Sequence, residues 1–98
     1  RAFKIDAVWT RLGSDSETAI LYAEDHNGGL WDVTASRNGN WRVRTAPAQY
    51  DDDRRYKEGS VDADAFVNSR ELFAAAKKAA RKYLIGLLTQ LAEEERSR

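Results

Sequence analysis

The chain contains one histidine, His26, the side chain best suited to move a proton near neutral pH. A general base also needs a hydrogen-bonded partner and a pocket. His26 directly precedes Asn27 and Gly28, a pair typical of tight turns, and no serine or acid at an identifiable spacing accompanies it. We therefore interpret His26 as a turn residue. The absence of cysteine excludes thiolate catalysis and a disulfide framework.

Five aspartates have the chemistry to hold a hard cation: Asp51, Asp52, Asp53, Asp62 and Asp64. They lack the ligand spacing and the glycine of a calcium loop, so a solvated acidic loop is the better interpretation. The chain also lacks a glycine-rich phosphate loop and a nucleophile motif. The sequence therefore predicts no enzyme, no metal site, no cofactor and no small-molecule ligand.

Nucleic-acid binding would use basic side chains against phosphates and aromatic side chains against bases. The 16 basic and 16 acidic residues cancel, so the chain has no overall attraction for nucleic acid. Trp31 and Trp41 alternate with polar residues, which favours core packing over base stacking. If the chain binds nucleic acid, the candidate residues are Arg42, Arg44, Lys77, Lys78, Arg81 and Lys82.

A long amphipathic helix is predicted over residues 68–95. Asn68 can act as its N-cap, and Val67 can pack on Leu72 as a hydrophobic staple. One broad stripe of this helix is apolar, and the small residues in its first half should let it lie close to a sheet. The stripe comprises Leu72, Phe73, Ala76, Ala79, Ala80, Tyr83, Leu84, Leu87 and Leu91.

Four strands are predicted before the helix, over residues 3–10, 19–24, 30–35 and 40–45. In three of them apolar and polar residues alternate with period two, which is typical of strands with one buried face. The side chains expected to be buried are Phe3, Ile5, Trp9, Leu21, Trp31, Val33, Trp41 and Val43.

The turn between the third and fourth predicted strands decides which of their side chains share a face. A three-residue loop with Gly39 in the left-handed conformation pairs Ser36 with Asn40. That register places Trp31 and Trp41 on one face, whereas a two-residue turn separates them. We therefore predict the three-residue loop.

The turn around Gly28 stays open between the same two forms. The three-residue form directs Leu21 inward and leaves Ile20 and Tyr22 outward, and the two-residue form reverses them. In either form one side of this strand exposes apolar surface.

Residues 46–60 are predicted as a long loop that includes the acidic run at 51–53. Within this stretch, Arg54 to Lys57 could add a short edge strand. Residues 61–67 could form a helical turn capped by Asp62 or Asp64.

These elements predict one domain, residues 1–98, of the α+β class. The expected fold is a four-stranded antiparallel meander with one face packed against the long C-terminal helix. The order of four strands and a helix is similar to that of a family of small single-strand-binding domains, in element order alone. This resemblance implies nucleic-acid binding as the alternative function.

We expect a small non-enzymatic module that acts through protein–protein contacts, by self-association or with another protein. One helix cannot cover both faces of the sheet, and exposed apolar patches usually mark partner sites. The absence of cysteine fits a cytoplasmic location, and no apolar run approaches the roughly 20 residues that span a membrane. The interface candidates are Ile20, Tyr22, Ile85, Leu88 and Leu91.

Overall fold

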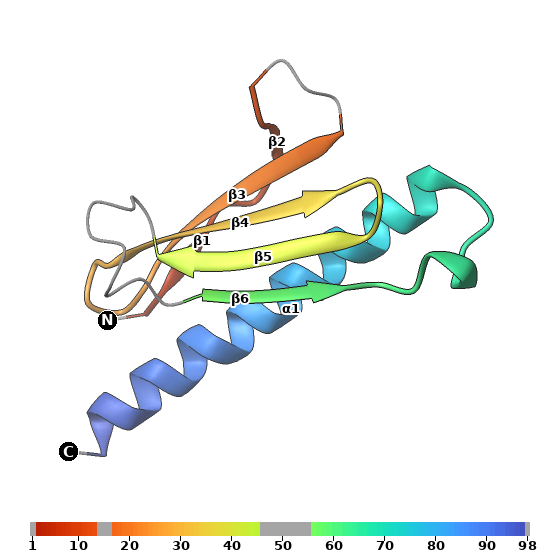
Figure 1. The fold of residues 1–98 in the computed structure, drawn as a ribbon. Coiled ribbons are helices and arrows are strands. Elements are labelled where there is room, and N and C mark those ends of the chain that lie inside the picture. The colour runs from red at the N-terminus through yellow and green to blue at the C-terminus, as the bar shows by residue number, and fades with distance from the viewer. Residues whose placement is uncertain (1, 14–16, 46–55, 98) are drawn as a thin grey trace.

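The computed structural model describes residues 2–13, 17–45 and 56–97, and of Tyr56 the backbone alone. An antiparallel sheet is followed by one long helix, so the α+β class is confirmed (Figure 1). The elements are β1 (Lys4–Ile5), β2 (Thr10–Arg11), β3 (Thr18–Glu24), β4 (Leu30–Ser36), β5 (Asn40–Thr45), β6 (Tyr56–Ser60), a 3-10 turn η2 (Ala63–Ala65) and α1 (Ser69–Arg96).

The sheet has the order β1-β3-β4-β5-β6, and β2 also pairs with β3. The single strand predicted over residues 3–10 is therefore two short strands on one edge. Ile5 lies opposite Ala23 and Thr10 opposite Ile20, so five steps along the first segment correspond to three along β3. The first segment therefore has two more residues than β3 between these two pairs, and the strand pairing is interrupted there. Because two is an even number, the side chains before and after the interruption still alternate between the same two faces of the sheet.

The turn between β4 and β5 has the predicted three-residue form. Ala35 lies opposite Trp41, and the Gly39 N–H donates to the Ser36 carbonyl at 3.0 Å. Gly39 has a φ of +96°, and a Cβ there would lie 2.8 Å from the Val61 carbonyl oxygen. Both the left-handed backbone and the close approach therefore require glycine at this position.

The turn between β3 and β4 resolves the alternative that the sequence left open. Gly28 has a φ of +83°, and Ala23 lies opposite Trp31, so Leu21 and Ala23 face the helix. Tyr22 lies on the opposite face and is half exposed. Its neighbour Ile20 shares that face but is buried, with β2 beside it.

The loop predicted over residues 46–60 is corrected at its C-terminal end by β6, which pairs with β5. The residues of β6 whose side chains are described are a lysine, a glutamate, a glycine and a serine. They show no alternation of apolar and polar side chains, so the local sequence pattern does not predict that this segment pairs with β5. The acidic run at 51–53 lies outside the described residues. Asp62 caps η2, and its side chain accepts from the Asp64 N–H at 3.0 Å.

The helix α1 begins where the sequence predicts, one residue after the Asn68 cap. The Asn68 side chain accepts from the Glu71 N–H at 2.9 Å. The hydrophobic staple does not form, because Val67 is 95% exposed whereas Leu72 is buried. The Asn68 cap therefore forms without a contact between Val67 and Leu72.

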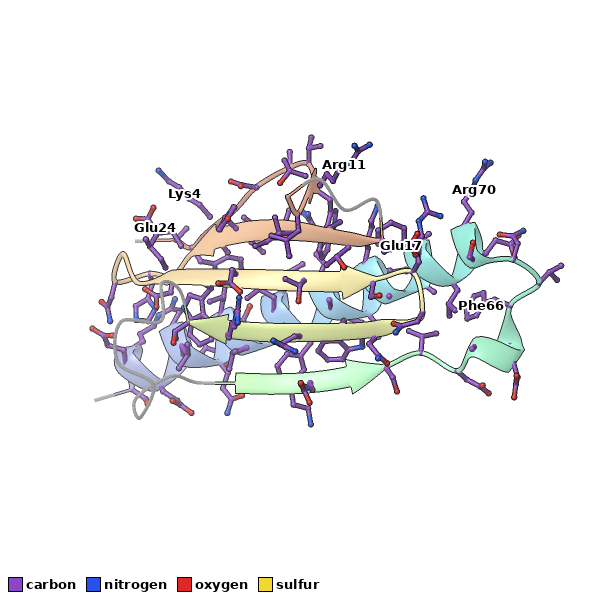
Figure 2. The ribbon with its side chains drawn as sticks, turned by 45° about the horizontal axis from the view of Figure 1, so that its top comes forward. Lys4, Arg11, Glu17, Glu24, Phe66 and Arg70 are labelled. Carbon is purple, nitrogen blue, oxygen red and sulfur yellow. The ribbon has the colours of Figure 1, made fainter. Side chains whose placement is uncertain are left out.

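The core lies between one face of the sheet and the apolar stripe of α1. The helix packs mainly against β4 and β5 and has little contact with β6. Ala76 and Ala80 are fully buried, which confirms the close helix–sheet approach expected from small residues. Figure 2 views the opposite, open face of the sheet, with α1 behind it. The central core comprises Leu21, Ala23, Trp31, Val33, Val43, Ala80, Leu84 and Leu88.

Candidate functional site

The open face of the sheet carries charged side chains that are already paired. Arg44 Nε donates to Asp32 Oδ1 at 2.7 Å, and Asp32 is 5% exposed. Arg42 Nη2 lies 3.5 Å from Glu58 Oε1 on the same face. A hollow of about 640 Å³ lies here, lined largely by polar side chains. Arg42 and Arg44 thus each lie near a carboxylate, so negative charges balance their positive charges on this face.

The basic residues of the helix lie on the other side of the sheet from Arg42 and Arg44. Arg81 Nη1 donates to the Asp6 carbonyl at 3.3 Å, and Lys77 Nζ lies 4.1 Å from the centre of the Phe73 ring. The structure therefore does not bring the six nucleic-acid candidates, which also include Lys78 and Lys82, onto one surface.

The five interface candidates are also divided. Leu88 is fully buried in the core and Ile20 is 7% exposed, so the expectation that they form an exposed surface is corrected. Leu91 packs against the core and is half-buried. Tyr22 and Ile85 are exposed, but Tyr22 lies on the open face of the sheet and Ile85 on the helix.

A groove remains between α1 and Trp41 of β5, the strand next to the edge strand β6. We call it the helix–edge groove. Its volume is about 540 Å³. Aromatic and aliphatic carbon forms most of its wall, with Lys82 and Gln90 at the rim. The lining residues are Trp41, Ala79, Lys82, Tyr83, Gly86, Leu87 and Gln90.

Trp41 and Tyr83 form the aromatic wall of the helix–edge groove. Their ring centroids are 5.6 Å apart, with an angle of 42° between the planes. Trp41 was expected in the core. It does pack against the core, but it stays half-buried. Its indole occupies the space where Gly59 would carry a side chain. Glycine at this position of β6 therefore leaves room for the indole of Trp41, with which any larger side chain would collide.

The outer edge of β6 pairs with no other described strand. The Val61 N–H donates to the Gly39 carbonyl at 2.9 Å, so the odd-numbered positions of this segment direct their backbone groups toward β5. By alternation, Glu58 and Ser60 direct their N–H and C=O groups away from β5.

Two lysines lie on the helix side of the sheet. Lys82 lines it, and Lys57, which lies opposite Val43, projects on the helix side of β6. Both are exposed, and no ion pair with either is found among the described residues. Glu58 follows Lys57 on β6, but its side chain projects to the open face of the sheet, where it lies near Arg42. The groove is therefore apolar inside, with one lysine, Lys82, among the residues that line it.

His26 lies in the β3–β4 turn, as predicted, and contacts the far end of the helix. Its Nε2 lies 2.6 Å from Glu95 Oε2, to which the Asn27 side-chain amide also donates at 2.7 Å. His26 Nδ1 is buried without a hydrogen-bond partner. This contact could not be predicted from local sequence patterns, because 69 residues separate His26 from Glu95.

Asp25 organises the same turn. Its Oδ1 accepts from the N–H groups of Asn27 and Gly29, and its Oδ2 accepts from the Trp31 indole at 3.0 Å. Burial alone would raise the pKa of this carboxyl. The hydrogen bonds from the indole and the two backbone N–H groups, with nearby His26, outweigh burial and hold the pKa below its ordinary value.

Comparison of the chain with family models, with curated proteins and with solved structures gave no match. Among the described residues no cluster of side chains has the makeup of a metal site. In the same part of the chain, no helix combines the length and the apolar character that crossing a bilayer requires. Function is therefore argued from the geometry of this chain alone.

Proposed function

We propose that the chain is a small non-enzymatic binding module that acts through protein–protein contacts, with the helix–edge groove as its binding surface. One observation carries the proposal: the aromatic pair Trp41 and Tyr83 forms the wall of an apolar groove along α1. Aromatic side chains in grooves are enriched at the energetic centres of protein interfaces.

The exposure of the groove residues supports this proposal. Tyr83 is 37% exposed and Trp41 is half-buried, although burial of either ring would stabilise the fold. A protein partner that fills the groove would remove this apolar surface from water. Contiguous exposed apolar surface is typical of such interaction sites.

Self-association stays a prediction. Tyr22 and Ile85, the two candidates that remain exposed, lie on different layers of the molecule, so a single two-fold contact would not cover both. Light scattering over a range of concentrations measures the oligomeric state directly. The alternative function, nucleic-acid binding, gains no support from arginines that are paired with Asp32 and Glu58.

A substitution at Gly86 tests the groove without weakening the fold. Gly86 lines the groove, and a Cβ there would meet no atom within 4 Å. Gly86→Leu fills the groove and replaces a poor helix former with a good one. Gly86→Ala is the matched control, because it gives the same helical benefit with a single methyl group.

The ligand for this test is selected rather than assumed. A library of random displayed peptides is panned on the whole chain, and the bound peptides are titrated by fluorescence anisotropy. We expect Gly86→Leu to weaken their binding by about tenfold or more and Gly86→Ala to change it little. Peptides that bind the Gly86→Leu variant as well as the original chain would overturn the proposed function, as would a failure to select any.

A further inference from the structure

We infer that the occupant of the helix–edge groove is a second copy of this chain, whose α1 lies antiparallel to α1 of the first copy across a two-fold axis near Gly86. The inference rests on the proposed function and names its partner. Two observations carry it: the positions of the groove residues along α1, and the separation of basic from acidic side chains along the exposed part of the same helix.

The groove residues of α1 form one continuous strip along the helix. Their spacing of three and four residues is typical of a surface that packs against another helix. Gly86 lies near the middle of the strip, and a Cβ there would meet no atom within 4 Å, so the backbone is open to a close approach. A two-fold axis at this point lets the same strip serve both copies. The strip comprises Ala79, Lys82, Tyr83, Gly86, Leu87 and Gln90.

An antiparallel pair centred on Gly86 fixes which residues meet. Two positions lie level with each other when they are equally far from Gly86 in opposite directions, at about 1.5 Å per residue. Tyr83 and Leu87 both lie within about 5 Å of the axis along the helix. Trp41 lies beside Tyr83, with ring centroids 5.6 Å apart. The apolar walls of the two grooves therefore come together at the centre of the contact.

The charges of α1 are unfavourably distributed in one copy alone. Lys78 and Lys82 lie before Gly86, Glu93 and Glu94 lie in the last turns, and all four side chains are exposed. Among the described residues, none of the four takes part in an ion pair. Glutamates near the C-terminus of a helix oppose its dipole, and the two lysines repel each other as a like-charge i,i+4 pair.

The antiparallel pair turns this distribution into attraction. Lys78 lies eight residues before Gly86 and Glu94 eight residues after it, so Lys78 of each copy lies level with the acidic end of the other. Lys82 lies level with Gln90, whose amide oxygen can accept from the ammonium group. The contact thus has an apolar centre and two ends of complementary charge, repeated by the symmetry.

Analytical ultracentrifugation of the whole chain, over concentrations up to about 1 mM, measures the predicted dimer. One variant combines Lys78→Glu with Lys82→Glu, and a second combines Glu93→Lys with Glu94→Lys. Each should weaken association about tenfold or more, whereas Lys4→Glu, on β1, is the control and should not. An equal mixture of the two variants should restore association, because every substituted end then meets an end of opposite charge.

The direction of pairing is tested by crosslinking, since the chain has no cysteine of its own. Helices packed about 8–10 Å apart bring α-carbons that face each other within reach of a disulfide, so oxidation should link two copies of Gly86→Cys. In the antiparallel pair, two copies of Lys78→Cys hold their thiols about 24 Å apart, whereas a parallel pair places them side by side. Crosslinking of Lys78→Cys as efficient as that of Gly86→Cys would overturn the antiparallel arrangement.

The outcomes separate this inference from the proposed function. If the chain stays monomeric while Gly86→Leu weakens binding of the selected peptides, the groove binds other proteins and the second copy is wrong. If the chain dimerises but the charge variants and Gly86→Leu leave the dimer intact, the contact lies elsewhere and the inference is equally wrong. If peptide binding is indifferent to Gly86→Leu, the proposed function itself fails. Circular dichroism and thermal unfolding verify that every variant folds.

Discussion

The indole of Trp41 lies directly against the α-carbon of Gly59, so that a Cβ on Gly59 would sit 2.2 Å from the ring. Two residues that lie opposite each other on neighbouring strands usually both place a side chain on the same face of the sheet. Here Gly59 has no side chain, and the side chain of Trp41 occupies the whole space. The arrangement keeps Trp41 against the core and at the same time leaves its edge in the helix–edge groove.

Substitution of Gly59 by alanine should therefore destabilise the protein. The added methyl group displaces the indole of Trp41 or separates β5 from β6, at a cost of about 1–3 kcal/mol. Gly86→Ala is the control, because its methyl group enters open space and should raise stability by up to about 1 kcal/mol. Urea unfolding measures both changes, and equal free energies of unfolding for the two variants would contradict the close packing.

The two ion pairs on the open face should differ in importance. Asp32 is buried, so Arg44→Ala leaves a buried carboxylate without its guanidinium and should cost about 1–3 kcal/mol. Arg42 and Glu58 are both well exposed, so Arg42→Ala should change the free energy of unfolding by less than about 0.5 kcal/mol. Chemical denaturation of the two variants compares them, and a larger loss in Arg42→Ala would refute this ranking.

Asp25 should make stability depend on acid pH. Its pKa is lower in the folded chain than its ordinary value near 3.9, so its contribution is complete above that value and is lost as pH falls through the folded pKa. Asp25→Asn lacks the negative charge at every pH. The original chain should be more stable than Asp25→Asn near neutral pH, and the difference should shrink at acid pH. A difference that stays constant across the range would show that the carboxylate charge is unimportant.

The contact of His26 and Asn27 with Glu95 should hold the last turns of α1 against the sheet. Glu95→Ala removes the carboxylate that both side chains contact. Because Glu95 is exposed, the global loss of stability should stay below about 1 kcal/mol. Amide exchange should instead become faster in the last two turns of the helix. Glu93→Ala, on an exposed neighbour, is the control, and equal exchange in the two variants would leave the contact without a role.

The sequence predicted those features that depend on local periodicity and turn chemistry. The apolar stripe and Asn68 located α1, and the alternation around Gly39 gave the correct facing of Trp31 and Trp41. It suggested a short edge strand from Arg54 to Lys57, which overlaps β6 at Tyr56 and Lys57, but it placed Glu58, Gly59 and Ser60 in a loop. Those three residues form a strand only through pairing with β5.

The helix–edge groove could not be predicted because it depends on where the helix crosses the sheet. The apolar stripe shows that α1 covers the sheet, but it does not show that β4 and β5 are covered and β6 is not. Leu88 was placed on the surface by helical spacing alone, whereas the actual rotation of α1 buries it completely. Tertiary packing therefore decides which part of the stripe remains available to a partner.

The most direct test is an amide-shift titration of the labelled chain with a peptide selected on it. The account predicts the largest shifts at the Trp41 indole N–H and at Gly86 and Leu87, which line the groove. Shifts gathered instead around Thr34 and Asn40, in the polar hollow on the open face, would contradict it.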